Sequence, residues 1–278
     1  MLGDAPLILA AMLAVVAVAV GVTFWRAERR RVRFLREAGV MLGGYFAYFA
    51  VRGATEGDYA VALKHAYWIV DFERGVGLWI EPRLQALVVD IDPIITAANW
   101  VYIWGHWPVI GVVAVWLFVR RPEHYVIYRN AFLLSGAVGL LLFITFPAAP
   151  PRLADLGFTD TVVDRSNFYH LLQPSQLTNQ YAAFPSLHFG WNLLMAVALL
   201  ETSRWHVTRI FAIVMPLAML AAIVLTANHY VIDAVAGAAV ALLGLVVARH
   251  LHAHPWRPQF ALFSTEGRGR ADVGQGGV

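Results

Sequence analysis

The sequence predicts an all-α, polytopic membrane protein: a bundle of six or seven transmembrane helices with further helices lying in the membrane interface. Of its 278 residues, 59% are hydrophobic and only 14% are charged, whereas ordinary soluble domains are about 25% charged. Apolar runs recur along the chain at roughly the 20-residue length that crosses a bilayer core. Short polar segments separate these runs, so six or seven crossings fit within one membrane domain.

The N-terminal segment 1–37 is predicted to be an anchor helix followed by a basic cytoplasmic segment. An apolar run from Leu7 to Trp25 is followed at once by six arginines between positions 26 and 36. A cleaved signal peptide would carry its positive charge before the apolar run, whereas here Asp4 precedes it. We therefore expect this helix to stay in the membrane, with its N-terminus outside.

Residues 38–250 are predicted to form the main membrane domain. The segment 55–92 mixes charged residues with tryptophan and leucine, which is typical of helices that lie in the interface. The tail 251–278 is polar and glycine-rich, and we expect it to be cytoplasmic and disordered. The remaining crossings are expected at 38–51, 93–119, 130–146, 184–200, 210–226 and 229–248.

The distribution of basic residues predicts the orientation of the bundle. Seven crossings that begin outside place fifteen of the 21 Lys and Arg residues in cytoplasmic segments, in agreement with the positive-inside rule. In this arrangement the loop 147–183 and the turn 226–229 both face outward. The sequence thus predicts a plasma-membrane protein whose polar chemistry lies on the extracytoplasmic face and whose C-terminus is cytoplasmic.

The segment 182–188 (AAFPSLH) leads a polar loop into a helix. We expect Pro185 at the first helical position, where proline is favoured, with Ser186 and His188 in the first turn. The free N–H groups of that turn and the positive end of the helix dipole favour an anion such as phosphate. The alternative is a capped helix that carries an interfacial histidine.

The segment 228–233 (NHYVID) opens the last predicted crossing. His229 and Asp233 are four residues apart and share one face of a helix. A carboxylate one turn away can hold the tautomer of the imidazole and leave its other nitrogen basic, as a nucleophile requires. The alternative is a structural pair between helices.

The segment 147–152 (PAAPPR) is a stiff stretch that would present Arg152 at the outer membrane face. The planar guanidinium suits phosphate because it donates two parallel hydrogen bonds. The alternative is an arginine that extends to the lipid headgroups.

Taken together, these motifs resemble those of the type 2 phosphatidic acid phosphatase superfamily. Pro185-Ser186-Leu187-His188 and His229 to Asp233 match its Pro-Ser-x-His and His-x-x-x-Asp patterns. The resemblance runs from about residue 90 to 248. The stretches PAAPPR, YAAFPSLHFGW and TANHYVID are most similar to the branch that contains inositol phosphorylceramide synthase and its bacterial relatives, an inositolphosphotransferase branch.

This resemblance implies a reaction and a role for each residue. His229 would attack the phosphorus to form a phosphohistidine, Asp233 would orient its ring, and His188 would protonate the leaving alcohol. Arg152 and Ser186 would bind the phosphate. The donor would be a membrane lipid or polyprenyl phosphate, and the acceptor water, a polyol such as inositol, or a sugar. We expect no nucleic-acid partner, because the basic residues alternate with apolar runs. We expect no metal and no other cofactor, because Asp155, Asp160 and Asp164 are scattered along a loop and form no carboxylate cluster among the motifs.

Three departures from the superfamily pattern favour a transferase over a simple phosphatase, and one of them is the absence of the first-motif lysine before the arginine. Leu187 stands where the phosphatase branch has glycine, and Ala222-Ile223 stands where it has Ser-Arg, so one phosphate-binding arginine is missing. A lipid phosphatase and a non-enzymatic transporter or scaffold remain alternatives. Four further residues are possible members of the pocket: Tyr181, Asn228, Tyr230 and His106.

Overall fold

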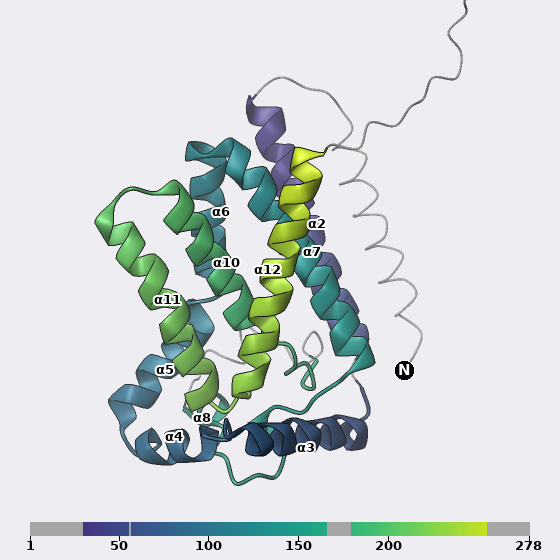
Figure 1. Ribbon diagram of the computed structural model, residues 1–278, viewed down its shortest axis with the longest axis vertical. Helices are drawn as coiled ribbons and strands as arrows, with labels where there is room; N and C mark the ends of the chain where they lie inside the picture. Colours follow the sequence, from purple (N-terminus) through teal and green to yellow (C-terminus); the bar gives the residue numbers. More distant parts are fainter. Residues whose placement is uncertain (1–29, 56, 166–178, 255–278) are drawn as a thin grey trace, which may run out of the picture.

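The computed structural model describes residues 30–55, 57–165 and 179–254 (Figure 1). Within these ranges the regular elements are helices. Two loop residues, Ala148 and Ala182, form one isolated β-bridge. The predicted first helix at 7–25 and the tail beyond 254 lie outside the described residues. The expected all-α membrane bundle is confirmed.

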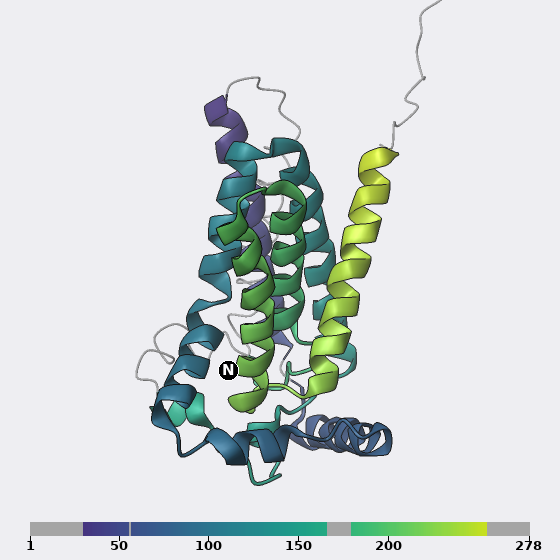
Figure 2. The same ribbon diagram turned by 60° about the vertical axis from the view of Figure 1, so that its left-hand side comes forward.

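The long helices run side by side along the bundle (Figures 1 and 2). Within the described ranges, α7, α11 and α12 are each long and apolar enough to cross a bilayer, α5 with α6 makes a fourth, bent candidate, and α10 is a shorter apolar helix. Their bounds are α2 (Arg30–Ala54), α5 (Asp92–Trp104), α6 (Trp107–Arg120), α7 (Pro122–Thr145), α10 (Leu187–Thr202), α11 (His206–Leu225) and α12 (Val231–Ala253).

The crossing predicted at 93–119 is two helices, α5 and α6, bent by 47° at Gly105 and His106. The physical reason is Pro108, in the first turn of α6. Proline has no N–H to donate to the preceding turn and its ring crowds that turn, so a straight helix is interrupted there. The break is important for the site because it places His106 at the inner side of the bundle.

Two helices lie crosswise at one end of the bundle, α3 (Tyr59–Val76) and α4 (Glu81–Val88) (Figures 1 and 2). Asp58 caps α3 by accepting the Ala60 N–H at 2.8 Å, and Gly77, at φ 75°, ends it. One face of α3 is buried while Trp68 and Phe72 are exposed on the other. This is the arrangement expected of an amphipathic helix in a membrane interface. Two short helices complete this end, η1 (Pro151–Leu153) and α8 (Thr161–Arg165).

Glycines allow α10 and α12 to pack with their backbones in contact. A Cβ added at Gly237 would lie 2.0 Å from the Ser186 carbonyl oxygen, and one added at Gly190 would lie 2.3 Å from the Gly237 carbonyl oxygen. Small residues at such crossings bring membrane helices together. This contact sets the position of the N-terminus of α10, and therefore that of His188.

Gly237→Ala is expected to destabilise the protein by about 1–3 kcal/mol, the usual cost of forcing an extra carbon into a packed interior. Thermal unfolding in detergent measures the effect. Gly111→Ala on α6 is the control, because within the described residues no atom beyond its own helix backbone lies within 4 Å of its added Cβ. A Gly237→Ala protein as stable as the Gly111→Ala protein would contradict the close packing described here.

Candidate active site

The segment that follows α7 pairs with the loop that precedes α10. The Ala148 N–H donates to the Tyr181 carbonyl at 2.7 Å, and the Ala183 N–H donates to the Ala148 carbonyl at 3.2 Å. His65 of α3 supports the same segment, with its Nδ1 2.7 Å from the Pro147 carbonyl oxygen. Backbone pairing therefore holds two of the predicted motifs together.

The turn between α11 and α12, together with the first turn of α12, binds to both of these segments. The Arg152 N–H donates to the Ala227 carbonyl at 3.0 Å, and the Ser186 N–H donates to the Asp233 carbonyl at 2.9 Å. The three motifs predicted from the sequence consequently meet at one end of the bundle, the end that α3 and α4 cover (Figure 1).

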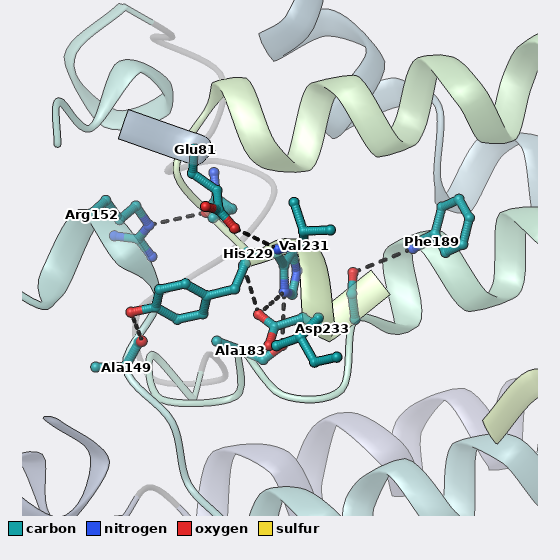
Figure 3. Close-up of polar contacts among 12 residues, drawn as sticks. Glu81, Ala149, Arg152, Ala183, Phe189, His229, Val231 and Asp233 are labelled. Carbon is teal, nitrogen blue, oxygen red and sulfur yellow. Dashed lines mark hydrogen bonds and ion pairs between the residues drawn. The ribbon is translucent and has the colours of Figure 1, made fainter. Parts of the chain in front are cut away.

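His229 lies in this turn with one ring nitrogen fixed (Figure 3). Its Nδ1 is 2.8 Å from the Ala183 carbonyl oxygen and 3.4 Å from Asp233 Oδ2. A carbonyl can only accept, so the Nδ1 proton donates to Ala183 and Nε2 is left as the basic nitrogen. The predicted partner, Asp233, is the more distant one, and its Oδ2 also accepts the Tyr230 N–H at 2.9 Å.

Burial favours the neutral imidazole of His229, whose side chain is 6% exposed. Desolvation, together with the charges of Arg52 and Arg152, lowers the pKa of His229 to about 3, against the opposing effect of the hydrogen bond to Ala183. Because this pKa lies below the ordinary value, the ring stays unprotonated as the pH falls through 6.5. The neutral ring has the free electron pair that a nucleophile needs.

His188, in the first turn of α10, brings a second imidazole to the same place. The centroids of the His188 and His229 rings are 5.7 Å apart. Tyr102 stacks on His188 with a centroid distance of 4.6 Å, and His106 lies 4.2 Å from it on the side of the helix break. Two histidines, one from α10 and one from the turn before α12, are thus close enough to contact one phosphoryl group.

Arg152 is held by the protein and does not extend away from it. Its Nε donates to Asn228 Oδ1 at 3.0 Å, and its Nη1 donates to Asp160 Oδ2 at 2.8 Å. The side chain is 11% exposed. Asn228 in turn donates to the Thr226 hydroxyl at 2.9 Å. This network orients the guanidinium at the edge of the histidine pair.

A cavity of about 40 Å³ joins these groups. A water needs roughly 10–15 Å³ of such volume, so the cavity is small, with room for only a few waters. Its lining includes the predicted residues Arg152, His188, His229, Asn228 and His106, together with Arg52, Tyr48, Tyr102, Gln180 and Ala183.

Four of the predicted residues are not part of the cavity lining: Tyr181, Ser186, Tyr230 and Asp233. Helix α10 begins at Leu187, so Ser186 is the N-cap and Pro185 precedes the helix, which corrects the expectation that proline occupies the first helical position. The Ser186 hydroxyl accepts the Phe189 N–H at 3.4 Å (Figure 3). Tyr230 donates to the Ala149 carbonyl at 3.2 Å. Tyr181 packs against the ring of Tyr59, and Asp233 is fully buried beneath His229. Phosphate binding by Ser186 stays a prediction.

Two buried glutamates that the sequence analysis did not single out hold the start of α12. Glu81 Oε1 accepts the Val231 N–H at 2.8 Å, and Glu73 Oε1 accepts the Ile232 N–H at 2.7 Å. Both side chains are fully buried, and burial together with the neighbouring Glu81 raises the pKa of Glu73. The crosswise helices α3 and α4 therefore position the turn that carries His229. No local motif distinguishes these residues from an exposed acid such as Asp71.

The class of protein follows from comparison with known families. Residues 67–247 match the family model described as the PAP2 superfamily. The match covers more than half of the chain, so the chain belongs to the PAP2 superfamily, as its motifs predicted. This membership, together with the apolar helices, supports a lipid phosphatase or phosphotransferase family for the chain and makes it an integral membrane protein.

Part of the chain is also similar to one curated protein with a named activity. The phosphoinositol dihydroceramide synthase of Bacteroides thetaiotaomicron is 26% identical over a match of 144 residues, and the match covers 46% of this chain and 46% of that protein. The match thus covers less than half of either chain. No solved structure matches the chain.

Proposed function

We propose that the chain is a membrane lipid phosphotransferase that moves a phosphoryl group or a phospho-headgroup between a lipid and an alcohol through a phosphohistidine. The observation that carries this proposal is the meeting of His188 and His229, 5.7 Å apart by ring centroid, on one cavity with Arg152. The relative's name, a synthase of a phosphoinositol lipid, favours transfer to an alcohol over transfer to water.

In the first step, Nε2 of His229 attacks the phosphorus while the bond from phosphorus to the leaving oxygen breaks. The leaving oxygen takes a proton from His188, acting as general acid. Arg152 donates hydrogen bonds to the phosphoryl oxygens as their charge shifts. The Ala183 carbonyl and Asp233 lie at the Nδ1 side of the nucleophile, where positive charge develops.

In the second step, the acceptor hydroxyl gives its proton to the now neutral His188, and its oxygen attacks the phosphorus. The bond between phosphorus and Nε2 breaks, which restores His229. Splitting one difficult transfer into two easier ones is the general advantage of covalent catalysis. All of these steps use side chains of the chain itself and assign no task to a metal or another cofactor.

The nature of the acceptor is tested by incubating purified protein with labelled phospholipid or polyprenyl phosphate, with and without inositol, a sugar or a ceramide. A product that carries the label on an added alcohol supports the phosphotransferase. Release of inorganic phosphate alone supports the second candidate, a lipid phosphatase. If neither product forms, the result would contradict an enzymatic role and favour the transporter or scaffold.

We also infer that the site faces the extracytoplasmic side of the plasma membrane and that the C-terminus is cytoplasmic. The sequence contains no cysteine, so single cysteines can report the orientation. An impermeant maleimide is expected to label Asp90→Cys, in the turn between α4 and α5, on intact cells. Arg204→Cys, in the turn between α10 and α11 at the other end, should react only after permeabilisation (Figure 1). The reverse pattern would overturn the orientation.

A further inference from the structure

Arg52 is a second guanidinium in the cavity. It lies in the last turn of α2, outside the residues 67–247 that match the family model. It lines the same cavity as His188 and His229, and its charge lowers the pKa of His229, as that of Arg152 does. Two cations therefore act on the proposed nucleophile, although only Arg152 belongs to a predicted motif.

The protein satisfies the guanidinium of Arg52 only in part, and Tyr48, which lines the same cavity, is one of its partners. Its Nε is buried and has no hydrogen-bond partner within the described part of the chain. Its Nη2 makes a long contact, 3.4 Å, to the Asn179 carbonyl, and its Cζ lies 6.0 Å from the Phe143 ring. No described carboxylate forms an ion pair with it, whereas Arg152 pairs with Asp160. Arg52 as a whole is partly buried, and a partly buried cation without a carboxylate partner is stabilised by an anionic ligand.

The place where the phosphatase branch carries its further arginine is filled here by apolar packing. Ala222 and Ile223 are 1% and 0% exposed and belong to the core between α11 and its neighbours. The Ile223 carbonyl accepts the N–H groups of Asn228 and His229, each at 3.1 Å. That position therefore shapes the turn, and the second positive charge enters the cavity from α2.

We propose that Arg52 is a substrate-binding residue that, together with Arg152, binds the phosphate or phosphodiester group of the lipid. The ligand supplies the anion that the buried Nε lacks, and a guanidinium donates two hydrogen bonds to phosphate in one plane. The assignment rests on the proposed function. It adds the reason why a chain without the superfamily arginine still offers two guanidinium groups to one phosphate.

The test is phosphate binding by the purified full chain in detergent, followed as the rise in melting temperature with increasing inorganic phosphate. Arg52→Gln is expected to weaken the apparent phosphate affinity about 10- to 100-fold, the usual effect of losing a charge-assisted hydrogen bond. Arg52→Lys, which keeps the charge, should retain most of the affinity. Arg33→Gln, an exposed arginine on the same helix, is the matched control and should bind as the unaltered protein does.

The melting temperature without phosphate separates binding from a structural role. If Arg52 serves a ligand, then Arg52→Gln removes an uncompensated charge, and the phosphate-free protein should melt at the same temperature or higher. Unchanged phosphate affinity in Arg52→Gln, or no binding by the unaltered protein, would overturn the inference. The labelled-lipid assay is read separately. Arg52-dependent phosphate binding without turnover would sustain this inference and reject the proposed function.

Discussion

His229→Asn is expected to reduce turnover by about 10³-fold or more, because it removes the atom that forms the covalent bond to phosphorus. The asparagine amide can still donate to the Ala183 carbonyl, which now accepts from Nδ1 at 2.8 Å, so the turn should keep its shape. The measurement combines the labelled-lipid assay with mass spectrometry of quenched reactions. In the unaltered protein we expect a phosphorylated peptide that contains His229, together with the released leaving group.

The matched control is His206→Asn, which changes an exposed histidine at the other end of the bundle. It should leave both turnover and the phosphorylated peptide unchanged. Retained turnover in His229→Asn would contradict covalent catalysis by this residue. If the unaltered protein shows no turnover and its cellular function survives His229→Asn, the result would instead favour the transporter or scaffold.

His188→Gln is expected to lower turnover by about 10²- to 10⁴-fold with a lipid donor, the range that general acid catalysis contributes. The reason is that an alkoxide is a poor leaving group until it receives a proton. A 4-nitrophenyl phosphate ester needs no such proton, so its first step should suffer much less from the same substitution. The measurement compares the burst of 4-nitrophenol release with turnover of the lipid donor in one preparation.

An equal loss with both donors would contradict the role of His188 as general acid and would indicate that it positions the phosphate instead. Asn192→Ala is the control on the same helix. Asn192 lies one turn after His188 and donates to its carbonyl at 2.9 Å, so this change removes a nearby polar group while leaving both imidazoles. The ratio of the two rates should then stay at that of the unaltered protein.

Much of the fold could be predicted from composition and pattern, because a bilayer imposes strict limits on the chain. Apolar runs of membrane-spanning length became the helices α7, α11 and α12, and the charged, tryptophan-containing stretch between 55 and 92 became the crosswise helices. Boundaries were less predictable. The straight crossing expected at 93–119 is bent, because Pro108 cannot donate a backbone hydrogen bond. Hydropathy measures only how apolar a segment is, so it does not predict this bend.

The sequence by itself determined the family and the short motifs that place His188, His229 and Arg152, because each motif depends on local spacing along one chain. Only the tertiary structure decided which groups surround those residues. Ala183 accepts a hydrogen bond from His229, Glu73 and Glu81 cap α12, and Arg52 brings a second positive charge to the cavity. These contacts join residues far apart in sequence, and their geometry depends on how closely the helices pack. A hydrogen bond or a buried charge between distant segments produces no periodic pattern in the sequence, so these contacts could not be predicted from it.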